Sequence, residues 1–88
     1  MPTAIEKEAA QFVSEPEVRE VLTLKKELYG GSTEAMQRDL RERLERRPYI
    51  HKLHTRIRTD LGRLDKIGGY ERAGVDLYSL LQNVSGKK

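Results

Sequence analysis

Apolar residues recur every three or four positions along most of this chain, and turn-forming residues interrupt them. That spacing places the apolar side chains on one face of an α-helix. It predicts helices at about residues 3–13, 15–29, 33–47, 49–67 and 75–84. No segment alternates apolar and polar residues as a half-buried strand does. The sequence therefore predicts an all-α fold, a small bundle of four or five helices in a single domain spanning residues 1–88.

Short polar motifs indicate where several of these helices begin. Thr3 followed by Glu6, and Ser14 followed by Glu17, have the spacing of a capping box, in which each side chain accepts a hydrogen bond from a backbone N–H at the helix start. Pro16 fits the first turn of the second helix, because the N–H that proline lacks would be unpaired there. We expect the first two helices to begin at these motifs.

Glycine pairs and one proline indicate where helices end. Gly-Gly pairs at 30–31 and 68–69 are expected to close the second and fourth helices, because glycine adopts the left-handed conformation found at helix ends. Pro48 disfavours helical geometry at the residue before it. It therefore either begins the fourth helix or kinks one long helix.

Composition favours a folded protein without disulfides. Leu, Ile, Val and Phe make up 21 of the 88 residues, and the net charge is only +3, which together argue against disorder. The absence of cysteine excludes disulfides and thiolate metal sites. No apolar stretch is long enough for a transmembrane helix or a signal peptide. We therefore expect a cytoplasmic protein with no membrane contact.

Charge is distributed unevenly along the chain. Residues 1–37 carry 4 basic and 7 acidic side chains, whereas residues 38–66 carry 10 basic and 5 acidic ones. Two interpretations remain open. In the first, the basic middle segment binds an outside partner, either nucleic acid or an acidic protein. In the second, it pairs with the acidic segment inside the fold.

The basic segment is the candidate nucleic-acid interface. Its cations would contact the phosphate backbone, since no aromatic residues are interleaved with them to stack on bases. The opposing interpretation is a solvent-facing helix with internal ion pairs, because acidic and basic residues stand four apart through residues 38–47. The candidate nucleic-acid-binding residues are Arg46, Arg47, Lys52, Arg56, Arg58 and Arg63.

No residue pattern indicates catalysis or a cofactor. His51 and His54 stand three apart, a spacing that suits a metal, but no third ligand accompanies them and Arg58 would oppose a cation. We therefore interpret both as ordinary surface or rim histidines. No nucleophile with a base and no phosphate-binding glycine loop occurs, so we expect neither an enzyme nor a metal or cofactor site.

The last helix is the candidate protein interface. Its apolar side chains cover more than half of its circumference, and a helix of that kind is either central in the fold or shared with a partner. The interface residues are Val75, Leu77, Tyr78, Leu80, Leu81 and Val84. The function expected from the sequence is a non-enzymatic protein-interaction or assembly module that joins a protein partner or another copy of itself. The alternative is a nucleic-acid-binding protein.

Overall fold

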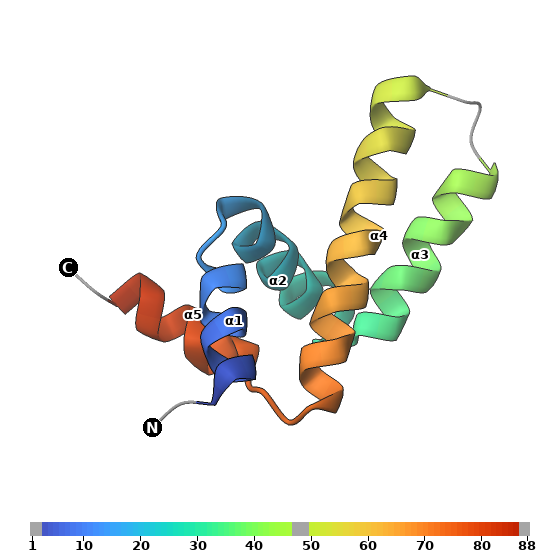
Figure 1. Ribbon diagram of the computed structural model, residues 1–88. Helices are drawn as coiled ribbons and strands as arrows, with labels where there is room; N and C mark the ends of the chain where they lie inside the picture. Colours follow the sequence, from blue (N-terminus) through green and yellow to red (C-terminus); the bar gives the residue numbers. More distant parts are fainter. Residues whose placement is uncertain (1–2, 47–49, 87–88) are drawn as a thin grey trace.

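The secondary-structure elements of the described residues are all helices. The computed structural model describes residues 3–46 and 50–86, with side chains described as far as residue 82. Within these residues the elements are all helices, which confirms the all-α prediction (Figure 1). They are α1 (Ala4–Val13), α2 (Pro16–Tyr29), α3 (Thr33–Arg46), α4 (His51–Arg72) and α5 (Leu77–Gly86). None of the described helices is long and apolar enough to span a membrane.

The first capping prediction is confirmed and the second is wrong. Thr3 Oγ1 accepts a hydrogen bond from the Glu6 N–H at 3.2 Å, and the Thr3 N–H donates to Glu6 Oε1 at 2.9 Å. The bond from the Thr3 N–H, followed by a bond from the Thr3 hydroxyl to the same oxygen at 3.1 Å, stabilises the ionised carboxylate and lowers the pKa of Glu6. Ser14 instead donates back to Gln11 O at 2.6 Å, at the end of α1. Glu15 is the residue before α2, and its side chain makes no capping bond.

The two Gly-Gly predictions have different outcomes. Gly30 and Gly31 have φ of 61° and 84° and end α2, as expected. The prediction for 68–69 is wrong, because α4 continues to Arg72. A glycine costs a helix only about 1 kcal/mol, and buried Ile67 anchors this stretch.

Gly68 lies inside α4 and does not end it. It is buried, and a Cβ atom built there would lie 3.8 Å from Thr33 Cγ2, an ordinary contact distance, and 3.3 Å from Nη1 of the flexible Arg72 side chain. The helix ends before Gly74, which has φ of 84°.

Pro48 lies outside the described residues, as does Arg47, but the helices on either side of them are separate. α3 ends at Arg46 and α4 begins at His51. The two helices lie side by side in opposite directions, so the chain turns back between them instead of continuing as one kinked helix (Figure 1). We call this pair the α3–α4 hairpin.

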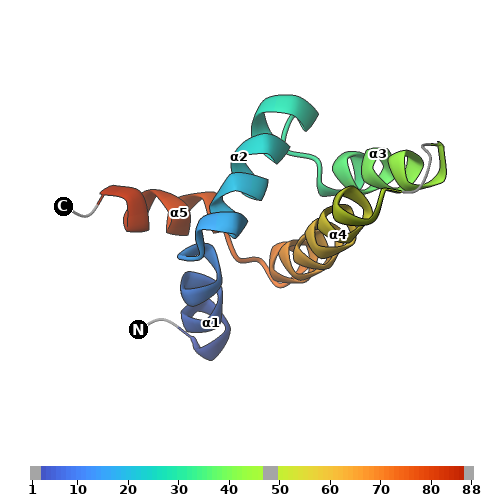
Figure 2. The same cartoon turned by 90° about the horizontal axis from the view of Figure 1, so that it is seen from above.

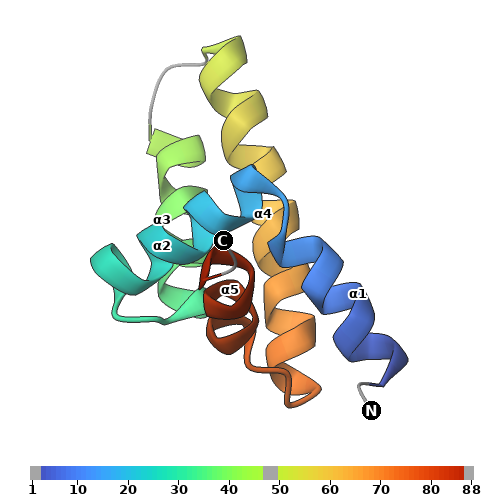
Figure 3. The ribbon, with the colours of Figure 1, turned by 90° about the vertical axis from the view of Figure 1, so that its left-hand side faces the viewer.

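The remaining helices pack at one end of the hairpin. Figure 2 shows α1, α2 and α5 on one side and the hairpin on the other, and Figure 3 shows the three helices in front of it. The molecule is elongated, with principal extents of 48 × 27 × 22 Å. The buried apolar core residues are Ala9, Phe12, Val13, Val18, Val21, Leu22, Met36, Leu40, Ile57, Leu64, Ile67 and Leu77.

A buried lysine fastens the hairpin to α2. The side chain of Lys25 is 0% exposed, and its Nζ donates to Glu71 Oε2 at 2.6 Å, Thr33 Oγ1 at 3.0 Å and Gly31 O at 3.2 Å. Thr33 Oγ1 donates in turn to Glu71 Oε1 at 2.6 Å. These four residues, which we call the base clamp, join the end of α2 to the first residue of α3 and to the end of α4. Every donor of the buried ammonium has an acceptor, as burial of a charge requires.

Candidate protein-interaction surface

An apolar cavity opens between α2 and the α3–α4 hairpin. Leu28 from α2 and Leu53 from α4 line it, with exposed fractions of 66% and 37%. Its volume is about 190 Å³. The other lining residues are Leu24, Tyr29, Met36, Leu40, Arg43, Arg56, Ile57 and Asp60. Leu28 and Leu53 therefore present apolar surface to solvent at this cavity, as residues at protein-interaction sites do.

Tyr29 and Asp39 stiffen the wall of this cavity. The Tyr29 hydroxyl donates to Asp39 Oδ2, and Arg43 lies 3.2 Å from the same oxygen. Burial, followed by the bond to Asp39, raises the pKa of Tyr29 above its ordinary value. The tyrosine is therefore neutral at physiological pH and ties the end of α2 to α3.

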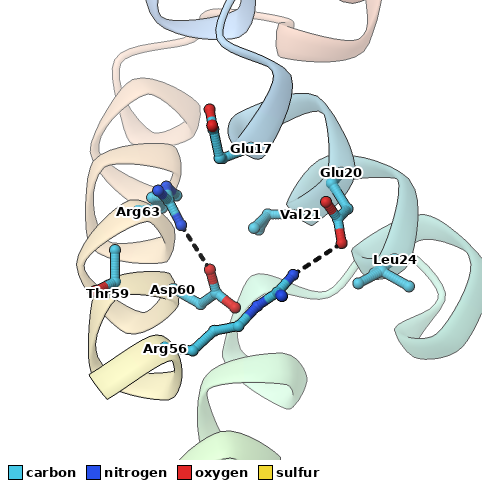
Figure 4. Close-up of a pocket in the computed structure, with 8 residues that line it drawn as sticks. All are labelled: Glu17, Glu20, Val21, Leu24, Arg56, Thr59, Asp60 and Arg63. Carbon is cyan, nitrogen blue, oxygen red and sulfur yellow. Dashed lines mark hydrogen bonds and ion pairs between the residues drawn. The ribbon is translucent and has the colours of Figure 1, made fainter. Parts of the chain in front are cut away.

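The cavity continues into a charged groove along α2 and α4. Figure 4 shows Arg56 reaching across from α4 to Glu20 on α2, with Nη2 and Oε1 3.0 Å apart. Arg63 Nη1 contacts Asp60 Oδ1 at 2.8 Å on the same side of α4. Glu17 lines the end of the groove near Arg63. Three carboxylates and two guanidinium groups therefore line this part of the groove.

The apolar cavity and the charged groove form one continuous surface. They share Leu24, Arg56 and Asp60 as lining residues. On the α2 side the surface extends from Glu17 to Leu28, which at 1.5 Å per residue is about 16 Å, or three helical turns. We call this surface the α2–α4 groove.

The sequence analysis did not single out this surface, although a signal for it was present. Leu24 and Leu28 stand four apart, so they form a second stripe on α2 beside the stripe of buried valines and Leu22. Lys25 occupies a core position in that buried stripe. Because a lysine there looks like a solvent-facing residue, the two sides of α2 could not be separated from the sequence.

The predicted α5 interface is largely engaged within the chain. Leu77 is only 2% exposed, so it belongs to the core and is not available to a partner, which corrects the prediction for that residue. The Tyr78 hydroxyl donates to Leu22 O at 3.1 Å. Leu80, Leu81 and Val75 are half-buried against the core, and the side chain of Val84 lies outside the described residues. The sequence predicted a helix that is central or shared, and within the chain α5 packs mainly against α1 and also against α4.

The candidate nucleic-acid-binding residues do not share one face. Arg56 and Arg63 line the α2–α4 groove and are paired with Glu20 and Asp60, as described above, and Arg46 lies 3.9 Å from Glu42. Arg58 stands two residues from Arg56, which is about 200° around the axis of α4. Lys52, four residues before Arg56, is exposed on the groove side. Arg47 is outside the described residues.

The interpretation of His54 as a surface or rim residue is wrong, because it is only 5% exposed. Its Nδ1 atom lies 3.2 Å from the nitrogen and 3.0 Å from the carbonyl oxygen of Ile50, which precedes α4, so the tautomer decides whether it accepts from the first or donates to the second. In either form His54 bonds to the backbone at the start of α4. His51 is exposed. Across residues 3–46 and 50–86, no cluster of three or more His, Asp or Glu side chains is arranged to hold a metal ion.

Comparison of the chain with protein-family models, with curated proteins and with solved structures finds no match in any of the three. The features of this chain that bear on function are the exposed leucines of the α2–α4 groove and the ion pairs along its walls.

Proposed function

We propose that this chain is a non-enzymatic protein-interaction module that binds its partner in the α2–α4 groove. The observation that carries the proposal is the exposure of Leu28 and Leu53 on opposite walls of one cavity. A small domain has few large apolar side chains to spare, and leaving two of them beside a cavity is unfavourable unless a partner covers them.

The surroundings of these leucines match the anatomy of a protein interface. Such interfaces have an apolar centre, a polar rim and a preference for arginine over lysine. Arg43 and Arg56 line the cavity, and their side chains are 52% and 66% exposed. Each already has a carboxylate partner within the chain, so its guanidinium plane is oriented before binding occurs.

Nucleic-acid binding is the alternative, and the ion pairs make it the weaker one. Phosphate would have to displace Glu20 from Arg56 and Asp60 from Arg63, while Glu17 repels it. If the alternative were correct, affinity for a duplex oligonucleotide would fall with salt at a log–log slope of about −0.9 for each phosphate neutralised.

Site-specific photo-crosslinking in cells that make the protein tests the proposal. A photoreactive phenylalanine replaces Leu28 in one variant and Arg58, which is exposed on a different face of α4, in a control. We expect a discrete protein adduct from position 28 that is absent from position 58. The adduct should disappear when Leu53→Asp is added, because a carboxylate would then occupy the apolar wall.

Two outcomes would contradict the proposal. Equal protein adducts from positions 28 and 58 would show contact without a defined site. An adduct with nucleic acid in place of protein would favour the alternative function.

A further inference from the structure

The charges along the α2–α4 groove change sign from one end to the other. At one end, the three carboxylates of Glu17, Glu20 and Asp60 outnumber the two guanidinium groups of Arg56 and Arg63. Leu28 and Leu53 lie further along, beside the apolar cavity. Arg43 at the cavity pairs with Asp39, and towards the free end of the hairpin Arg46 pairs with Glu42 while Lys52 is exposed. The order along the surface is therefore acidic, apolar, basic.

Ion pairs within the chain cancel most of these charges and leave one at each end. Arg56 pairs with Glu20 and Arg63 with Asp60, while the arginines of α3 pair with their own carboxylates. In the part of the chain that the structure describes, no ion pair engages Glu17 at the acidic end or Lys52 at the basic end. These two side chains are exposed and carry opposite charges.

A surface that is acidic, apolar and basic in order is complementary to itself. A twofold axis through the apolar centre places the acidic end of one copy against the basic end of the other, and brings the two sets of exposed leucines together. Such a contact uses the same patch on both subunits and closes at two copies. A second copy of this chain therefore carries the charges that complement both ends of the groove.

We infer that the occupant of the α2–α4 groove is a second copy of this chain, related by a twofold axis near Leu28 and Leu53. This inference rests on the proposed function, since it names the partner of the same surface. In the dimer, Glu17 of each copy faces the partner's Lys52. The two contacts are equivalent by symmetry, so every substitution acts twice.

Charge reversal tests the arrangement directly. Glu17→Lys gives a chain with lysine at both ends of the groove, and Lys52→Glu gives a chain with a carboxylate at both ends. Each variant alone should lose association relative to the unmodified chain, with a dissociation constant at least about tenfold higher, because two attractive contacts become two repulsive ones. When the two variants are mixed in equal amounts, every contact becomes attractive again. The mixture should recover the dimer.

Sedimentation equilibrium from about 10 µM to 1 mM measures these associations, a range that covers weak as well as moderate dimers. Arg58→Glu is the matched control for Lys52→Glu, because it makes the same charge change on a different face of α4. Glu27→Lys is the control for Glu17→Lys, because Glu27 lines a different cavity, between α2 and α5. Both controls should associate like the unmodified chain, and Leu28→Asp should be monomeric. Circular dichroism establishes that each variant is folded.

Three results would overturn the inference. The unmodified chain could remain monomeric throughout the range, or Leu28→Asp could dimerise normally, or the mixture of reversed variants could associate no better than its components. A monomeric chain that still gives an adduct with another protein from position 28 would leave the proposed function intact and refute only the identity of the partner.

Discussion

Replacing Glu71 by alanine should destabilise the protein more than replacing its partner, Lys25, by methionine. The two ends of this ion pair differ in burial, because the Lys25 side chain is 0% exposed and the Glu71 side chain is 37% exposed. Water can solvate the carboxylate when its partner is removed, but it cannot reach the ammonium. The cost of losing either partner is therefore set by the group left behind.

The magnitudes follow from the contacts of the base clamp. Glu71→Ala leaves a buried ammonium with only neutral acceptors, and an uncompensated buried charge costs about 3–5 kcal/mol. Lys25→Met retains the apolar stem but loses the hydrogen bonds to Gly31 and Thr33. Because water solvates the freed Glu71 carboxylate, the loss should lower the free energy of unfolding by only about 1–2 kcal/mol. The difference between the two variants is about 2 kcal/mol. Combining both substitutions removes the stranded charge, so the double variant should be more stable than Glu71→Ala.

Urea unfolding followed by circular dichroism measures these differences. With a slope of about 1 kcal/mol per molar urea for a chain of this size, the two midpoints should differ by about 2 M. Glu42→Ala is the control, because its pair with Arg46 is exposed and 3.9 Å long, and such pairs contribute less than about 1 kcal/mol. If Lys25→Met proved as destabilising as Glu71→Ala, the difference in burial would not govern this pair.

Three further predictions concern stability. Gly62→Ala should raise the melting temperature and Gly74→Ala should lower it, each by roughly 4–8 °C for about 1 kcal/mol, because a Cβ at 62 meets nothing within 4 Å whereas Gly74 has φ of 84°. Leu77→Ala should lower the free energy of unfolding, measured in urea, by about 2–5 kcal/mol, because Leu77 is a core residue. A change near zero would show that Leu77 is not part of the core. Burial raises the pKa values of Tyr29 and Tyr78 above 10.0. Their contribution to stability is therefore complete below pH 10 and is lost as the pH rises through the raised values. The urea midpoint should then fall more steeply above pH 10 than in Tyr29→Phe/Tyr78→Phe, and equal slopes would contradict this.

The existence of the helices could be predicted from apolar spacing, but the end of α4 could not. The sequence rule treats glycine as a conformational signal, and Gly30 obeys it because it adopts positive φ. Gly68 does not obey it, because α4 continues through this residue to Arg72. The burial of Leu64 and Ile67 against other helices holds this stretch of α4, and those contacts are absent from the local pattern around residue 68.

The candidate site was less predictable than the fold for a related reason. Burial of Lys25 depends on Glu71, which lies 46 residues away in the chain. Burial of His54 depends on how the start of α4 packs. Apolar spacing places polar residues on the outside, so it misassigned His54 and gave no sign that Lys25 is buried. The exposed leucines of the α2–α4 groove were not predicted either, because apolar spacing assigns every leucine in a stripe to the buried side of its helix.

The base clamp has a consequence for how this architecture can vary. Thr33 and Glu71, at the two ends of the hairpin, are bonded to each other, so the polypeptide leaves the three-helix base and returns to it at one point. Insertions or deletions of matched helical turns in α3 and α4 would change the length of the arm while the base kept its geometry. Lengthening would carry Lys52, together with the neighbouring Leu53, away from Glu17 in steps of about 5.4 Å per turn. The spacing between the charged ends, and with it the choice of partner, would then be adjustable independently of the core.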